Sequence, residues 1–175
     1  DTAQARQIAT RVAKAYRLET GQQLAAAIVS PPRITSGDGD VPVSTIAIRP
    51  DTSTGQNEEG ESDVMPADKS LQFVLCGLGS GCSISSGVTS EERQALLRRE
   101  ALELALYTFK YVDDIDSVSV FLPPRPDGQA APNSVFLRRS DVRSLLQKPL
   151  DTSIAPRTPT VGTMPQREID LVDRV

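Results

Sequence analysis

The sequence has 175 residues, of which 38% are hydrophobic and 24% are charged, and this suits one globular domain with a core of its own. Its formal charge is −4, and the 19 basic residues are scattered among 23 acidic ones, which argues against a nucleic-acid partner because phosphate binding needs clustered cations. The absence of histidine excludes Ser-His-Asp and Cys-His catalytic systems and imidazole metal ligands. Carboxylate chemistry, Ser-Lys pairs and oxygen-ligand metal sites remain.

The apolar segments and the two ends of the sequence bear on whether the chain is attached to a membrane. No apolar run approaches the ~18–20 residues that a membrane-spanning helix needs. The sequence begins inside a helical pattern at Asp1, without a charged-then-apolar signal segment, and it stops as abruptly. We therefore expect a soluble part of a longer protein, with any membrane anchor outside this chain.

The first residues are predicted to be helical. Residues 2–20 carry apolar side chains at helical spacing, and Gly21 is expected to end that helix. In residues 22–30 the alanines favour helix, whereas a β-branched pair before Pro31 also suits a short strand. We predict helix for this segment.

Two strands and a long connection follow. Residues 43–49 alternate as a strand, and Pro42 and Pro50 on either side suit an edge position. Residues 51–69 are acidic and lack periodicity, so we expect a long exposed connection. The next segment, LQFVLC at residues 71–76, is apolar on both faces and is predicted to be a central strand.

The stretch from Thr89 to Val112 is the clearest helix. Thr89 and Glu92 have the spacing of a capping box, and no Gly or Pro interrupts the residues that follow. The first half is predicted to carry solvated charge pairs such as Arg99 with Glu103. The second half is apolar nearly all round, which predicts a buried helix. Core packing is the interpretation of the aromatic residues within and just after it: Tyr107, Phe109, Tyr111 and Phe121.

The remaining elements complete a fold prediction. Two strands are expected at residues 117–122 and 134–138, with a short helix at 140–148. The order α-β-β-α-β-β-α over residues 1–149 predicts one α+β domain, with a four-stranded antiparallel or mixed sheet and helices packed on one face. Residues 150–175 are rich in Pro and Thr at first, so we expect an extended tail or linker with a helical turn or two at its end.

The two cysteines of the chain, Cys76 and Cys82, lie at the end of a predicted strand with GLGSG between them. This spacing favours a local disulfide, which would indicate an oxidising compartment. A pair of free thiols and a redox-active pair are the alternatives.

The glycine-rich loop between the cysteines is a candidate anion-binding site. Gly-rich turns between a strand and a helix can present backbone N–H groups to phosphate, which singles out Gly77, Gly79, Ser80 and Gly81. The loop completes neither a G-x-G-x-x-G motif nor a P-loop ending, so a turn pinned by the disulfide is the alternative that we favour.

The aspartates after the long helix, Asp113, Asp114 and Asp116, are weak candidates for Ca²⁺ or Mg²⁺ binding. The same applies to Asp38 and Asp40. No EF-hand pattern accompanies either group, and aspartate commonly forms turns. We predict no metal and no cofactor.

The leading functional hypothesis is a non-enzymatic binding or interaction domain outside the cytoplasm, periplasmic, on the cell surface or secreted, with a partner of unknown type. One alternative is an enzyme that uses Ser or carboxylate chemistry near the loop at 77–87, in which a serine meets Lys69 or a carboxylate in a concave site. Another alternative is an intracellular scaffold with reduced thiols.

Overall fold

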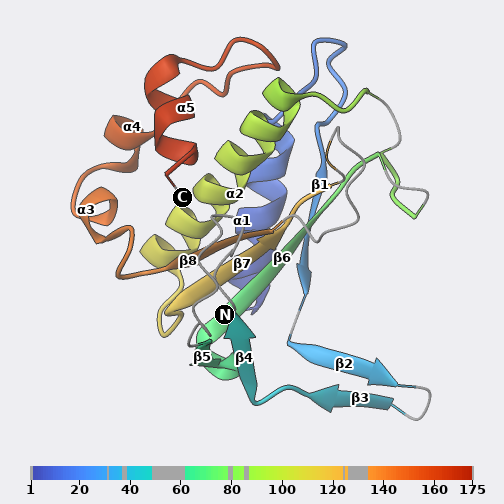
Figure 1. Ribbon diagram of the computed structural model, residues 1–175, viewed down its shortest axis with the longest axis vertical. Coiled ribbons are helices and arrows are strands. Elements are labelled where there is room, and N and C mark those ends of the chain that lie inside the picture. Colours follow the sequence, from blue (N-terminus) through green and yellow to red (C-terminus); the bar gives the residue numbers. More distant parts are fainter. Residues whose placement is uncertain are drawn as a thin grey trace.

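The computed structural model describes residues 2–30, 32–36, 39–48, 62–78, 81–84, 87–123, 125 and 134–174. These residues form an α+β fold around a four-stranded sheet (Figure 1). Its helices are α1 (Thr2–Ala15), α2 (Glu91–Tyr111), α3 (Arg143–Leu146), α4 (Leu150–Ser153), α5 (Gln166–Val172) and the 3₁₀ turn η1 (Ala67–Lys69). Its strands are β1 (Ala26–Ser30), β2 (Arg33–Ser36), β3 (Gly39–Pro42), β4 (Thr45–Ile48), β5 (Asp63–Pro66), β6 (Ser70–Cys76), β7 (Ser117–Phe121) and β8 (Ser134–Arg138).

The main sheet has the order β1-β6-β7-β8 and is mixed. Its two central strands, β6 and β7, are parallel, and each outer strand is antiparallel to its neighbour. A parallel pair cannot be joined by a tight turn, and α2 is the crossover that connects β6 to β7. The predicted α+β class and four-stranded sheet are therefore confirmed, and of the two predicted sheet types, antiparallel or mixed, the sheet is mixed.

One face of the sheet forms the core. Strand residues alternate so that buried apolar side chains from neighbouring strands share a row, as do Phe73 and Val120. Helix α1 packs against β1 and α2, and α2 contacts β7, β8 and α5. On the opposite face Ile28 and Phe121 remain 50% and 38% exposed.

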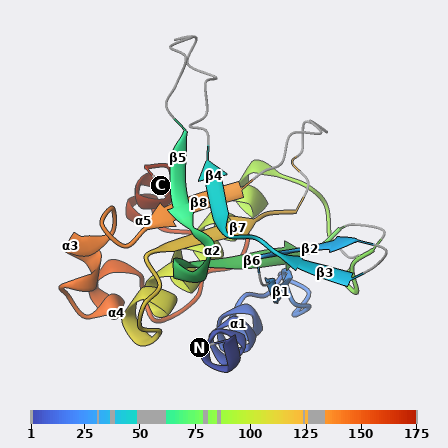
Figure 2. The ribbon, with the colours of Figure 1, turned by 90° about the horizontal axis from the view of Figure 1, so that it is seen from below.

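The first strand of the sheet differs from the prediction. Residues 26–30 form β1, not helix, because Ile28 and Val29 pair with the central strand β6 and this pairing outweighs the helix propensity of the alanines. The strand predicted at 43–49 is present as β4 but lies outside the main sheet, paired with β5. A further two-stranded ribbon, β2–β3, lies between β1 and β4 in the sequence. Figure 2 shows the β4–β5 ribbon extending away from α1.

The start of α2 lies slightly later than predicted. Ser90, not Thr89, is the N-cap, and its Oγ accepts a hydrogen bond from the backbone N–H of Arg93 at 3.1 Å. The predicted burial of residues 104–112 holds for most of them, but Tyr111 is 54% exposed and Tyr107 is half-buried. Among the described residues, no helix combines the length and apolar character needed to cross a membrane.

The C-terminal residues are not an extended tail. The chain forms α4 and α5 there, and α5 packs against α2. Ile154 and Val172 are buried in the main core, and Glu168 is also buried. The expected helical turns at the end of the chain are present as α5, and they belong to the packed structure because their apolar side chains cover α2.

Candidate functional site

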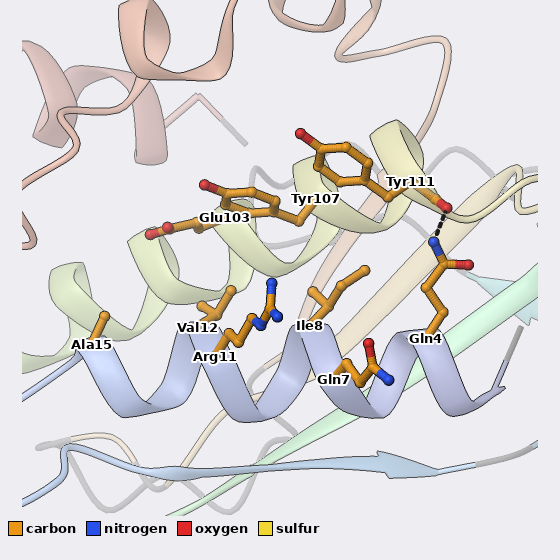
Figure 3. Close-up of a pocket in the computed structure, with 9 residues that line it drawn as sticks. All are labelled: Gln4, Gln7, Ile8, Arg11, Val12, Ala15, Glu103, Tyr107 and Tyr111. Carbon is orange, nitrogen blue, oxygen red and sulfur yellow. Dashed lines mark hydrogen bonds between the residues drawn. The ribbon is translucent and has the colours of Figure 1, made fainter.

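The groove between α1 and α2 is the candidate site, with a cavity of about 500 Å³ (Figure 3). It lies on the side of the helix pair where their side chains converge and reach the surface. Its lining consists of Gln4, Gln7, Ile8, Arg11, Val12, Ala15, Glu103, Tyr107 and Tyr111.

The shape of the groove follows from the residues on the two helices. The buried face of α1 is rich in alanine, including Ala5 and Ala9, so α1 packs closely. Ile8 and Val12 form an apolar floor. Tyr107 and Tyr111 stand one turn apart on α2, and their rings stack with centroids 6.0 Å apart and planes inclined by 19°. An apolar floor and an aromatic wall result.

A buried polar cluster closes one end of the groove. The hydroxyl of Tyr16 donates a hydrogen bond to Glu103 Oε2 at 2.5 Å, and Arg99 Nη1 donates to the same oxygen at 3.2 Å. Burial raises the pKa of the Glu103 carboxyl, although the hydrogen bond from Tyr16 and the Arg99 charge act in the opposite direction. Burial also raises the pKa of the Tyr16 phenol well above its ordinary value. The hydrogen bonds from Tyr16 and Arg99 thus hold the Glu103 carboxyl in place where it lines the groove.

Arg99 connects this cluster to the C-terminal helices. Its Nε donates to Glu168 Oε2 at 2.6 Å, and its Nη2 donates to the carbonyl of Ala155 at 2.9 Å. The other oxygen of Glu168 accepts from the backbone N–H of Ala155 at 2.7 Å. Because Arg99 and Glu168 are each only 1% exposed, this ion pair fixes the position of Glu103 beside it.

Helix α1 carries three cations, and one of them, Arg11, lines the groove. Arg6, Arg11 and Lys14 lie on α1, and residues 2–15 include no acidic residue. All three are exposed, and none forms an ion pair with any part of the chain that the structure describes. Figure 3 shows the guanidinium of Arg11 directed toward α2. Helix α1 therefore carries an excess of positive charge in a chain whose net charge is −4.

The lining of the groove determines which groups a ligand would meet there. Its lining offers aromatic faces, side-chain amides and one cation, and it includes no serine, cysteine, threonine or lysine. The carboxyl of Glu103 already accepts hydrogen bonds from Tyr16 and Arg99. These groups can orient a ligand through apolar contact and hydrogen bonds.

The predicted disulfide is present. Cys76 and Cys82 are bonded, with their Cα atoms 5.4 Å apart, and they close the turn after β6. The bond lies outside the α1–α2 groove, so its contribution is to hold the loop that leads toward α2.

The glycine-rich loop is only partly described, since Gly79 and Ser80 lie outside the described residues. Gly77 is buried, and a Cβ there would lie 3.1 Å from the carbonyl of Leu24 and 3.4 Å from Arg93 Nη2. Gly81 has open space at the corresponding position. Gly77 therefore makes room for the Arg93 guanidinium, which donates to the carbonyl of Leu24 at 2.9 Å. Anion binding by this loop stays a prediction.

The three aspartates after α2 lie in different surroundings. Asp113 and Asp114 are exposed, and Asp114 has a φ of 62°, typical of a turn. Asp116 lines a second cavity, away from the groove. Within the described ranges, no three His, Cys, Asp or Glu side chains are grouped so that they could hold a metal ion.

The aspartates of the first ribbon are only partly described. Asp38 lies outside the described residues. Asp40 pairs with Arg33, with 3.8 Å between Oδ2 and Nη1. This contact across the β2–β3 ribbon gives Asp40 a structural partner.

The serine-based alternative is partly addressed. Ser83 is exposed, and the other serines of residues 80–86 lie outside the described residues. Lys69 lines the second cavity, together with Ser70 and Ser117.

Sequence reasoning missed the buried polar cluster. Arg99 and Glu103 were correctly predicted to pair, but Arg99 is buried and Glu103 is half-buried, so the pair is not a solvated one. The other partners of Arg99, Tyr16 and Glu168, are 83 and 69 residues away in the chain. No local pattern signals such contacts, because helical spacing reports only the partners on the same helix.

No protein-family model, curated protein or solved structure matches this chain.

Proposed function

We propose that this chain is a non-enzymatic interaction domain that binds an acidic peptide segment of a partner protein in the α1–α2 groove. The observation that carries the proposal is an apolar and aromatic groove whose lining includes Arg11, an exposed cation that has no ion-pair partner among the described residues. An acidic segment matches this charge, and complementary charge favours association and selects partners.

The dimensions of the groove suit a peptide. Gln4 and Ala15, at its two ends on α1, are separated by a helical rise of roughly 16 Å. An extended chain of about five residues covers that length. An aromatic or aliphatic side chain of the peptide would lie on Ile8 and Val12 beside the ring of Tyr107, and the Gln7 amide is suited to pair with a peptide bond. Arg11 would contact a carboxylate of the peptide.

The proposed location is outside the cytoplasm. The disulfide between Cys76 and Cys82 supports it, because such bonds persist mainly in oxidising compartments. Mass spectrometry of protein isolated from its native compartment, with and without reduction, tests this part separately. A mass increase on reduction is expected, whereas two free thiols would favour the intracellular scaffold.

Selection from a random dodecapeptide library tests the groove. Enriched peptides should contain Asp or Glu beside an aromatic or aliphatic residue. Synthesised as fluorescent peptides, they should bind the Arg11→Glu and Tyr107→Ala variants at least tenfold more weakly in anisotropy titrations. Arg167→Glu is the matched control because Arg167 is exposed on α5 and lines neither the groove nor the second cavity.

Two results would overturn the proposal. One is an enriched set of peptides with no excess of acidic residues. The other is unchanged affinity of those peptides for Arg11→Glu, since the charge argument depends on that side of the groove.

A further inference from the structure

A second cavity, of about 460 Å³, lies where β6 and β7 begin and β8 ends. Residues of β5, η1 and α3 complete its walls, and it shares no residue with the α1–α2 groove. Four of its lining residues are cationic, Lys69, Arg138, Arg139 and Arg143, and one, Asp116, is acidic.

The sheet builds the base of this cavity. Ser70, Ser117 and Arg138 are aligned across three neighbouring strands. The Oγ atoms of the two serines are 2.7 Å apart, and Ser70 Oγ also donates to the carbonyl of Pro66 at 2.8 Å. The Ser70 proton is thereby used, so the Ser117 hydroxyl donates to Ser70. These hydroxyls hold the strands together, and the cations are the groups available to a ligand.

The four cations differ in whether they already have hydrogen-bond or ion-pair partners. Arg139 donates to the carbonyls of Phe109, Val112 and Ile115 and so closes the C-terminal end of α2. Arg138 is paired with Asp63. In the part of the chain that the structure describes, the side chains of Lys69 and Arg143 form neither an ion pair nor a hydrogen bond.

The excess of positive charge is local. The four cations outnumber Asp116, and counting Asp63 as a second acid still leaves a net charge of +2, from 4 − 2. The chain as a whole has a net charge of −4. A concave site with charge opposite to that of the whole molecule attracts anions in preference to cations.

We propose that this cavity binds a small phosphomonoester, with Lys69 and Arg143 contacting the phosphoryl oxygens. A doubly charged phosphoryl group matches two cations on separate elements, and guanidinium groups bind phosphate through two parallel hydrogen bonds. Met65 and Leu146 supply apolar walls for the organic part of the ligand. The cavity volume lies within the range of small-molecule sites.

Phenyl phosphate is the probe for this site, compared with inorganic phosphate and with benzoate in NMR titrations at pH 7.5. Phenyl phosphate should shift the amide signals of Lys69, Ser117 and Arg143 and bind more tightly than either other probe. The Lys69→Ala/Arg143→Ala double variant should bind it at least tenfold more weakly, and added salt should weaken binding to the unaltered chain. Arg167→Ala should leave its affinity unchanged.

Three outcomes would overturn the proposal. Phenyl phosphate that shifts no signal at the cavity would exclude the site. If the double variant, folded by its amide spectrum, bound phenyl phosphate with unchanged affinity, Lys69 and Arg143 would not be the groups that contact the phosphoryl oxygens. Benzoate binding as tightly as phenyl phosphate would exclude recognition of the doubly charged group. None of these results depends on peptide binding at the α1–α2 groove.

Discussion

Arg99 and Glu100 are neighbours on α2, and both side chains are buried, but their surroundings differ. Arg99 donates to Glu168, Tyr16, Glu103 and the carbonyl of Ala155. Both carboxyl oxygens of Glu100 lack a hydrogen-bond partner among the described residues, and burial raises the pKa of this carboxyl well above its ordinary value.

This contrast shows that burial alone does not decide whether a charged residue stabilises a fold. A buried guanidinium with several acceptors is compensated, and losing those acceptors would be costly. A buried carboxyl without donors destabilises the fold unless it is protonated. The two side chains should therefore respond in opposite ways to replacement.

Arg99→Ala should have the largest effect. It leaves Glu168 buried without its ion-pair partner, and we expect the free energy of unfolding to fall by about 3–5 kcal/mol. Urea denaturation followed by circular dichroism measures this loss. The adjacent Arg98→Ala is the control, because the Arg98–Asp173 pair is partly exposed and should contribute less than about 1 kcal/mol. Equal losses of unfolding free energy in the two variants would contradict the view that the buried Arg99–Glu168 pair stabilises the fold more than the partly exposed Arg98–Asp173 pair.

Glu100→Leu should change stability in the opposite direction. It removes two buried oxygens without partners and keeps a side chain of similar size, so near neutral pH we expect the free energy of unfolding to rise by about 1–3 kcal/mol. The same urea titration measures the gain. A clear loss of stability would mean that Glu100 makes a contact that its surroundings do not suggest.

Removing the disulfide tests whether the turn after β6 needs covalent support. The Cys76→Ser/Cys82→Ser variant should lose roughly 2 kcal/mol, because a small closed loop constrains the unfolded chain only modestly. Hydrogen exchange should show the loss of protection mainly in residues 81–84 and 87–93. Equal loss of protection around Glu168 would show that the disulfide supports the whole fold.

The smallest expected effect is the change in the free energy of unfolding for each unit of pH. The pKa of Glu100 is raised in the folded state, so the native chain binds more protons than the unfolded chain above about pH 4.5, the ordinary value. The stability is fully present below that pH and falls as pH rises toward the folded pKa, by at most about 1.4 kcal/mol per pH unit for this group. Glu103, whose pKa is also raised, contributes in the same direction.

Glu100→Gln should make this fall shallower in urea titrations at a series of pH values. Arg98→Ala, which removes no buried carboxyl, should keep the slope of the unaltered chain. An unchanged slope in Glu100→Gln would mean that Glu100 is not the group that titrates.

Much of the architecture could be predicted from local patterns. The α2 helix, the central strand β6 and the Cys76–Cys82 bond follow from helix formers, an apolar run and close cysteine spacing, all of which act within a few residues. The segment at 26–30 was mispredicted because its strand state depends on pairing with β6, about 45 residues away.

The two cavities depend on contacts between distant segments. Tyr107 and Tyr111 were interpreted as core residues, since the apolar pattern of α2 does not show that α1 leaves them partly uncovered. Arg138 and Arg139 resemble an ordinary surface pair until the fold places Lys69 and Arg143 beside them. Glu168 is one acid among many in the sequence, and only tertiary packing assigns it to Arg99.

The pairing of Arg99 with Glu168 also bears on how the chain would respond to proteolysis. A cut after residue 149 followed by release of the C-terminal piece would take away both Glu168 and the Ala155 carbonyl, leaving a guanidinium beneath the surface with only Tyr16 and Glu103. Such a trimmed chain should unfold or be degraded further. Helices α4 and α5 are therefore an integral part of the folded domain, and the rest of the chain should not stay folded without them.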